Sequence, residues 1–173
     1  LIEDGDTFEA NALAKASQLA TWLKTQSLNN KQWYVLADDS GLEVDALGGR
    51  PGVFSARFAA DETACSGNAT DEANNAKLIR LLKEVPEKER TGRFRCVLAL
   101  INSFPKASTS GQWTFSGSCE GQLMLESSGD QGFGYDPLFR PKGFDQTFAE
   151  LGATIKNRIS HRSHALQKLK TFL

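Results

Sequence analysis

The sequence lacks several features that would assign it to a special class of protein. No apolar run approaches the roughly 20 residues that a transmembrane helix needs, and no stretch has the charged, apolar and small-residue order of a secretory signal. No segment rich in proline, glycine and serine divides the 173 residues. We therefore expect one domain, residues 1–173, with one core and no membrane partner.

An excess of charge of one sign is also missing, and cysteine is scarce. The 20 Lys and Arg residues nearly balance the 21 Asp and Glu residues, which gives a formal net charge of -1. A nucleic-acid-binding domain normally carries a basic excess, so we expect no nucleic-acid partner. Cys65, Cys96 and Cys119 lack metal-ligand spacing and predict buried thiols in a reducing compartment, the cytoplasm.

The stretch that organises the sequence is Ala37-Asp38-Asp39-Ser40-Gly41, directly after the apolar residues 33–36. The apolar run predicts a short buried strand that ends where the carboxylates begin, which is where α/β sheets bind ligands. Adjacent carboxylates are tolerated mainly where a cation or a proton compensates them. One interpretation is a metal-binding, water-activating site. The other is a solvated turn in which Asp38 or Asp39 caps Ser40-Gly41.

A helix is predicted between Asp6 and the pair Asn29-Asn30, because apolar residues recur there with the helical period. Asp6 would be its N-cap, with Glu9 completing a capping box. Glu3 lies just before this helix. Its charge suits the helix dipole, and a metal ligand is the alternative interpretation.

The middle of the chain predicts one further helix and two strands. Thr70 can cap a helix that Pro86 stops. Residues 93–101 and 112–125 alternate as strands do, and they are separated by a connection suited to a hairpin. The pattern of residues 53–58 does not decide between strand and helix.

A glycine-rich loop at residues 129–137 alternates glycines with aromatic residues. Such a loop lets the backbone approach a flat ligand while aromatic rings cover its faces. The alternative is that the rings belong to the core.

A basic cluster marks the start of the last predicted helix. Ser160 can be the N-cap, which places His161 and Arg162 in the first turn, where cations oppose the helix dipole. An anion held by Lys156, Arg162 and the helix end would remove that conflict. The alternative is a surface helix with exposed basic residues.

Together these stretches resemble the Ham1/RdgB family, the inosine triphosphate pyrophosphatases. The resemblance covers almost the whole chain and is carried by four groups of residues in order: Glu3-x-Gly5-x-Thr7-Phe8-x-x-Asn11-Ala12-x-x-Lys15-Ala16; Ala37-Asp38-Asp39-Ser40-Gly41-Leu42 with Gly49-Arg50-Pro51-Gly52 and Ser55-Ala56-Arg57; Gly132-Phe133-Gly134-Tyr135-Asp136-Pro137; and Ser160-His161-Arg162.

The resemblance implies an elongated α/β fold with a mixed central sheet flanked by helices, and two lobes with a nucleotide cleft between them. It also implies a homodimer and Mg2+-dependent hydrolysis of purine nucleoside triphosphates such as ITP, dITP and XTP to the monophosphate and pyrophosphate. Such an activity removes non-canonical nucleotides from the cellular pool.

The resemblance also implies roles for individual residues. Asp39 would be the catalytic acid-base and a metal ligand, with Asp38 beside it and Glu3 as the second metal carboxylate. The remaining residues would contact the substrate: Ser40, Phe133, Gly134, Tyr135, Asp136, Lys156, His161 and Arg162. Among these, His161 and Arg162 would help to read the 6-oxo group of the purine, a task that requires hydrogen-bond donors.

The sequence departs from the family pattern at its beginning. The family opens with a strand and a Thr/Ser-x-Asn-x-x-Lys phosphate-binding loop, and the chain starts at Leu1 without that motif. We expect the native protein to carry such a segment upstream. Two rival hypotheses remain: a Maf-type nucleotide pyrophosphatase, and a catalytically silent nucleotide-binding module.

Overall fold

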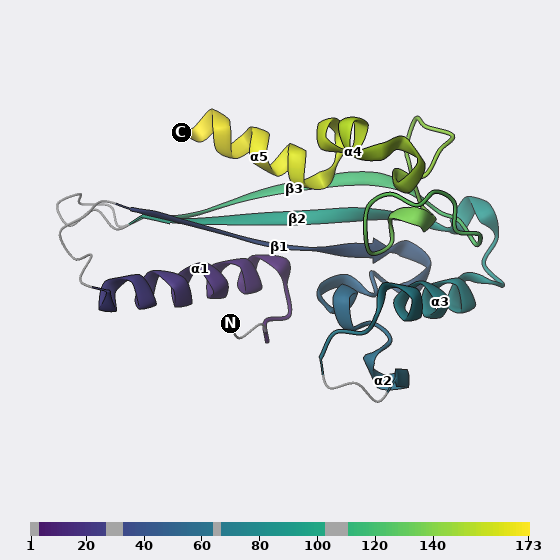
Figure 1. Cartoon of the computed structure of the whole chain (residues 1–173), viewed down its shortest axis with the longest axis horizontal. Helices are drawn as coiled ribbons and strands as arrows, with labels where there is room; N and C mark the ends of the chain where they lie inside the picture. Colours follow the sequence, from purple (N-terminus) through teal and green to yellow (C-terminus); the bar gives the residue numbers. More distant parts are fainter. Residues whose placement is uncertain (1–3, 27–32, 64–66, 103–110) are drawn as a thin grey trace.

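The computed structural model describes residues 4–26, 33–63, 67–102 and 111–173. Glu3, Asn29, Asn30 and Cys65 lie outside these described residues. The molecule is elongated along its strands, with helices on both faces of one sheet (Figure 1). This arrangement confirms the α/β class that the sequence predicts.

Four strands form the described sheet in the order β1-β2-β3-β4: β1 is Tyr34–Val44, β2 Thr91–Asn102, β3 Gln112–Leu123 and β4 Phe139–Pro141. All three pairings are antiparallel. Parallel pairing, which a mixed sheet requires, does not occur among the described residues. The predicted strands at 93–101 and 112–125 correspond to β2 and β3, which pair antiparallel as a hairpin requires. The connection predicted between them lies almost wholly outside the described residues.

The first strand differs from its prediction. β1 does not end at residue 36 but runs on through the two carboxylates to Val44, with Asp38 opposite Leu98 and Asp39 opposite Val97 on β2. The prediction of a turn at Ser40-Gly41 is therefore wrong. These residues pair with β2, a partner that the local sequence does not reveal. Gly41 has a packing reason to be in a strand: an added Cβ would lie 2.5 Å from the Gly52 carbonyl oxygen and 2.6 Å from Ser55 Oγ.

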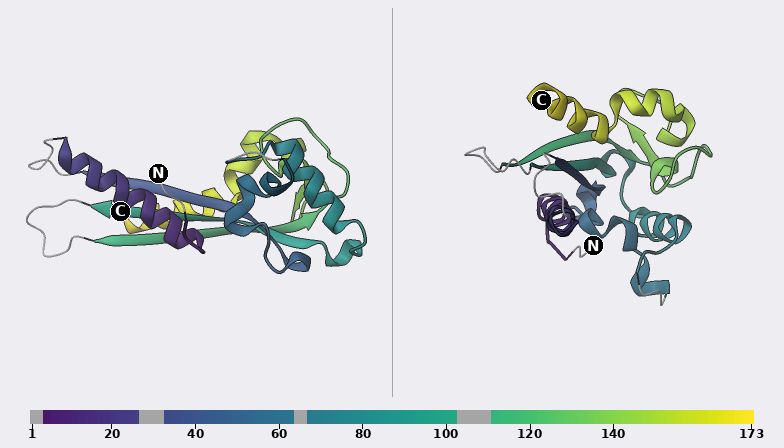
Figure 2. Two further views of the ribbon diagram at one scale, coloured as in Figure 1. Left: turned by 90° about the horizontal axis from the view of Figure 1, so that it is seen from below. Right: turned by 60° about the vertical axis from the view of Figure 1, so that its left-hand side comes forward.

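Two helices cover one face of the sheet and two cover the other (Figures 1 and 2). On the first face lie α1 (Phe8–Thr25) and α3 (Asp71–Leu82), and on the second lie α4 (Phe148–Ile159) and α5 (His161–Phe172). The N-cap of α1 is Thr7, not Asp6, because the Thr7 side chain accepts the Ala10 N–H. Thr70 caps α3 and Ser160 caps α5, as predicted.

Short elements complete the chain. The helix α2 spans Ala60–Thr63, and the 3-10 helices are η1 (Asp45–Leu47), η2 (Gly52–Arg57), η3 (Glu87–Glu89) and η4 (Asp136–Leu138). The undecided stretch at 53–58 is thus largely η2. Every helix within the described parts of the chain falls short of the length and apolar character needed to cross a bilayer.

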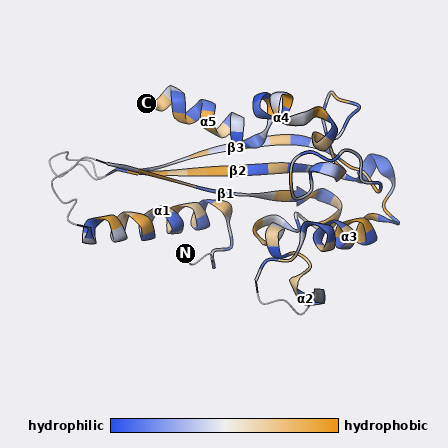
Figure 3. Cartoon of the chain, viewed as in Figure 1, coloured by the Kyte–Doolittle hydropathy of each residue, from blue (hydrophilic) through white to orange (hydrophobic). Residues whose placement is uncertain are grey.

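The core is divided among the layers. One cluster joins α1 to β1 and β2, a second joins α5 to β2 and β3, and the largest joins α3, η4 and α4 around the ends of the strands. The second half of β2, toward the left of Figure 3, is correspondingly hydrophobic, whereas its first half is largely hydrophilic. Cys96 and Cys119 are buried free thiols, as predicted, and burial raises the pKa of Cys119 to about 11.

The contact between α5 and the sheet depends on a glycine. A Cβ at Gly117 of β3 would overlap the α5 backbone at His161 and Ala165. Glycine at this position therefore lets the first turn of α5 rest directly on the strand.

We predict that Gly117→Ala lowers the free energy of unfolding by about 1–3 kcal/mol, because the added methyl group overpacks the interface between β3 and α5. Urea unfolding measures this change. Ser118→Ala, at the neighbouring exposed position, is the control and should stay within about 0.5 kcal/mol of the parent. Equal stability of Gly117→Ala and the parent would contradict the described packing.

Candidate active site

Asp39 is a buried carboxylate whose two oxygens are both engaged by α1. Lys15 Nζ lies 2.8 Å from Oδ1, and Asn11 Nδ2 donates to Oδ2 at 3.3 Å. Asn11 and Lys15 are four residues apart, so they share one face of the helix. The ion pair and the amide together offset the cost of burying the Asp39 charge.

Asp38 faces the opposite layer, as alternation along a strand requires. Its Oδ2 lies 2.8 Å from Arg162 Nη2 of α5, and Ser40 Oγ donates to the same oxygen at 3.3 Å. Burial disfavours the Asp38 carboxylate, but the hydrogen bond and positive charge of Arg162 outweigh burial and lower the pKa of Asp38 below 3.8. The two neighbouring carboxylates therefore have separate cations.

The loop before η4 folds around the carboxylate of Asp136. This buried side chain pairs with Lys156 of α4 and accepts the Phe133 N–H at 3.0 Å. Tyr135 is also buried, and its hydroxyl donates to the Ser55 carbonyl oxygen at 2.9 Å. The Phe133 ring is 66% exposed and lies 4.6 Å from Lys156 Nζ.

His161 is buried at the start of α5, where its ring stacks on Phe94 with centroids 5.0 Å apart and planes at 15°. Burial, with the nearby charges of Arg162 and Lys156, lowers the pKa of His161 to about 3. The ring is therefore neutral at pH 7. Its buried Nδ1 has no hydrogen-bond partner among the described residues, which leaves this atom available to a ligand.

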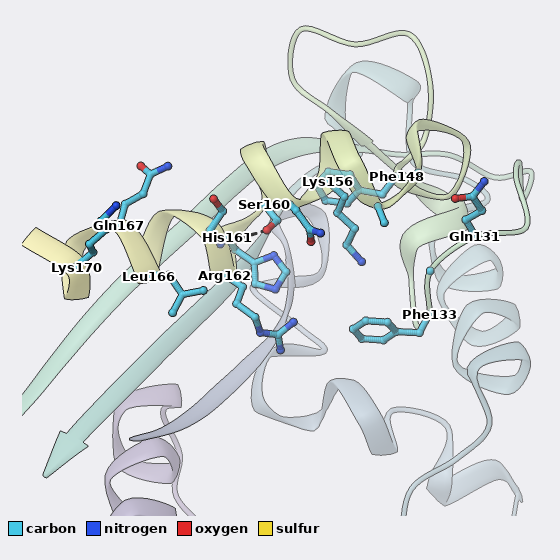
Figure 4. A pocket seen from close by; sticks show the side chains of 15 residues that line it. Gln131, Phe133, Phe148, Lys156, Ser160, His161, Arg162, Leu166, Gln167 and Lys170 are labelled. Atoms are coloured by element: carbon cyan, nitrogen blue, oxygen red, sulfur yellow. Dashed lines mark hydrogen bonds between the residues drawn. The ribbon is translucent and has the colours of Figure 1, made fainter. Parts of the chain in front are cut away.

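These segments meet around a cavity of about 160 Å3. All the residues that the sequence predicts to bind substrate line it: Ser40, Phe133, Gly134, Tyr135, Asp136, Lys156, His161 and Arg162. A second cavity of about 500 Å3 between the loop, α4 and α5 shares Phe133, Lys156, His161 and Arg162 (Figure 4). Asp38 and Asp39 line neither cavity but lie next to Ser40 on β1.

The carboxylates fit a hard cation by their chemistry. Mg2+ takes oxygen ligands and commonly uses one or two carboxylates together with water and substrate phosphates. Asp38 and Asp39 can supply such oxygens, and the described residues contain no cluster of three or more His, Cys, Asp and Glu side chains that would form an all-protein cage. Glu3, the other predicted ligand, lies outside the described residues.

Sequence reasoning gave no role to four polar residues that contact the site. Asn11 and Lys15 hold Asp39, and Asp71 and Asn75 of α3 hold Gly134. The first pair left a signal, since Asn11 and Lys15 interrupt an otherwise alanine-rich and leucine-rich helix face. The second pair left none, because its partner lies about 60 residues away.

The fold and the cavities define an α/β protein whose cleft presents cations, a neutral imidazole and an exposed aromatic ring, a combination suited to a flat ligand that carries negative charge. The chain belongs to the Ham1 family, whose model matches residues 1–172. This match bears out the resemblance drawn from the sequence motifs.

Curated relatives and solved structures agree with the family. The chain is 49% identical to a dITP/XTP pyrophosphatase from Desulforamulus reducens over 171 residues, which cover 99% of this chain and 76% of the relative. It is 46% identical to the dITP/XTP pyrophosphatase of Bacillus subtilis, with 99% and 77% covered. The Ham1 protein of Staphylococcus aureus superposes with a TM-score of 0.81 at 39% identity, covering 99% of this chain and 79% of that structure.

The buried His161 predicts how stability depends on pH. The unfolded chain binds a proton at His161 below pH 6.5, whereas the folded protein does not until about pH 3. The contribution of His161 to the free energy of unfolding is therefore fully present well above pH 6.5. It falls as the pH decreases, by about 2 kcal/mol between pH 7 and 5.

We expect His161→Gln to abolish most of this slope, because glutamine does not titrate. Urea unfolding at a series of pH values measures the slope independently of any absolute loss of stability. The parent protein, measured over the same pH series, is the reference. A slope that His161→Gln leaves unchanged would show that His161 is not buried as a neutral ring.

Proposed function

We propose that this chain hydrolyses non-canonical purine nucleoside triphosphates such as dITP, ITP and XTP to the monophosphate and pyrophosphate. One observation carries the proposal: the residues that would contact the base line a single cavity around the buried, neutral His161. The curated relatives with 43–49% identity are named dITP/XTP pyrophosphatases, which supports the same substrate class.

The base would lie between the loop and α5. The exposed ring of Phe133 offers a face for stacking. Arg162 and Lys156 supply hydrogen-bond donors, and His161 supplies another when its proton is on Nδ1. A 6-oxo purine accepts such hydrogen bonds, whereas a 6-amino group brings its own hydrogens toward the donors and leaves them unpaired. The pocket therefore favours inosine and xanthosine over adenosine.

Asp39 would act on the water in the hydrolysis. In the proposed step water attacks the α-phosphorus, the bond from that phosphorus to the bridging oxygen breaks, and pyrophosphate leaves with that oxygen. A carboxylate can accept the proton of the attacking water. Asn11 and Lys15 fix the Asp39 carboxylate from both oxygens, so its direction does not depend on substrate. Asp38 would act beside it by holding Arg162 near the cavity.

Mg2+ is the cofactor that this chemistry calls for, with Asp39 and Glu3 as its predicted carboxylate ligands. When bound, the ion would offset the negative charge of the phosphates. The enzyme would work in the cytoplasm as a homodimer, with no nucleic acid or membrane as partner. The buried thiols Cys96 and Cys119 suit that reducing compartment, and sedimentation at micromolar concentration tests the dimer.

We predict that Asp39→Asn reduces turnover of dITP by about 10²–10⁴-fold, because the amide keeps the shape but cannot accept a proton. Pyrophosphate release at saturating Mg2+ measures the loss. Asp45→Asn is a matched control, since Asp45 is also an ion-paired carboxylate but contacts Arg93 at the far end of β1; it should remain within about twofold of the parent. Near-parental turnover of Asp39→Asn would remove the assigned role.

We also predict that ITP is preferred over ATP by about two orders of magnitude in kcat/KM. His161→Ala or Arg162→Ala should reduce this ratio, because each removes a group at the base. Lys168→Ala, on the same helix but bound to the Ser116 carbonyl oxygen, should keep it. Equal hydrolysis of ITP and ATP by the parent protein would overturn the proposed substrate class.

A further inference from the structure

The backbone of Gly134, inside the loop that lines the cavity, is held by α3 at both of its polar groups. Its N–H donates to Asp71 Oδ2 at 2.6 Å, and its carbonyl oxygen accepts from Asn75 Nδ2 at 3.0 Å. Asp71 and Asn75 are four residues apart, so they stand on one face of the helix. We call these two hydrogen bonds the Gly134 clasp.

The clasp requires a particular backbone conformation. Gly134 has φ of 62°, in the left-handed region that an L side chain adopts only at a cost. A Cβ at this position would meet nothing within 4 Å. Conformation and not space therefore selects glycine here, and the clasp fixes a peptide that would otherwise be among the most flexible in the loop.

The residue that the clasp positions is Phe133. Its ring is exposed and has no place in the core; the side-chain contact described for it is with Lys156 Nζ at 4.6 Å. Its own N–H is fixed by Asp136, and the next residue is fixed by α3. The direction of the ring at the cavity thus depends on the hydrogen bonds to the backbone on both sides together with the Lys156 contact.

The hydrogen bond to the Gly134 carbonyl oxygen determines the orientation of the Asn75 side chain. Its side-chain Oδ1 is buried and has no hydrogen-bond partner in the described part of the chain, so the bond to Gly134 is what orients the amide. An unsatisfied buried oxygen carries a cost in stability. Because Asn75 leaves its Oδ1 unpaired while it donates to Gly134, we infer that the position of the Gly134 peptide is constrained.

We propose that Asp71 and Asn75 are positioning residues that set the Phe133 ring for stacking on the purine, and so determine substrate affinity and base selectivity without taking part in the chemical step. The inference rests on the proposed function. Asp39 is held by Asn11 and Lys15 alone among the contacts described above, so the clasp and the catalytic carboxylate share no residue.

The test compares four variants of α3 with XTP as substrate. Asp71→Ala removes the acceptor, and Asn75→Asp turns an oxygen toward the Gly134 carbonyl in place of the donor. Each should raise KM about tenfold and change kcat less than about threefold, which corresponds to the loss of one charge-assisted or buried hydrogen bond in the bound state. Asp71→Asn keeps an acceptor oxygen and should rescue KM. Glu72→Ala removes a neighbouring negative charge from the same helical turn and should behave as the parent.

A double-mutant cycle separates positioning from a general structural defect. In a Phe133→Ala background, Asp71→Ala should add little to KM, because the ring that it positions is already gone. Additive effects, or a fall in kcat equal to the rise in KM, would overturn the proposal.

The rate of hydrogen exchange at the Gly134 amide in the ligand-free protein measures whether its hydrogen bond to Asp71 is present, and it requires no turnover. Exchange should accelerate in Asp71→Ala and not in Glu72→Ala, and equal exchange would refute the contact. If the parent protein releases no pyrophosphate from XTP, the proposed function fails. The affinity for XTP measured by calorimetry then replaces KM, and an Asp71→Ala protein that binds XTP as tightly as the parent overturns the positioning role.

Discussion

The alternation of side chains along β1 is the constraint on which the site depends. Asp38 and Asp39 are consecutive residues of a paired strand, so they must leave the sheet on opposite faces. Each therefore needs a cation from a different layer: Lys15 from α1 and Arg162 from α5. These two ion pairs connect one strand to both helical layers, with Arg162 of α5 against Asp38 on one face and Lys15 of α1 against Asp39 on the other.

The two ion pairs differ in how firmly they hold. Lys15 and Asp39 have side chains only 15% and 10% exposed, and breaking a buried pair by removing one partner typically costs about 3–5 kcal/mol. Arg162 and Asp38 are each 42% exposed, where a pair contributes only about 0–1 kcal/mol. Arg162 can therefore turn from Asp38 toward a ligand at little cost, while Lys15 keeps Asp39 in place. The carboxylate proposed to be catalytic is thus held firmly, whereas the side chain proposed to bind the base is held weakly.

Sequence periodicity was sufficient for the elements whose signals are local. The strands β2 and β3, the cap of α3 at Thr70 and the cap of α5 at Ser160 all follow from patterns within a dozen residues. β1 was misread because Asp-Asp-Ser-Gly has the composition of a turn, whereas its extended form is imposed by β2, more than 50 residues away in the chain.

The same distinction applies to the site. The motifs identified most of the residues that line the cavity, though not Asp71, Asn74 and Phe94, and the structure brings them together. Asn11 and Lys15 appeared in a motif without a role, because only the packing of α1 on β1 directs them at Asp39. Asp71 and Asn75 could not be found at all, since nothing in α3 itself indicates that its first turns face a glycine in a remote loop.

A break in α4 at Gly152 allows this one helix to contact both ends of the glycine-rich loop. Gly152 has φ of 71° and ψ of 172°, which interrupts the helix at a position that only glycine adopts readily. The part before the break is fastened to the start of the loop, where Thr147 Oγ1 donates to the Ser128 carbonyl oxygen at 2.7 Å. The part after the break carries Lys156 to Asp136 at the other end of the loop. Because the break lets the two halves of α4 take different directions, each half contacts its own end of the loop, and one interrupted helix holds both ends.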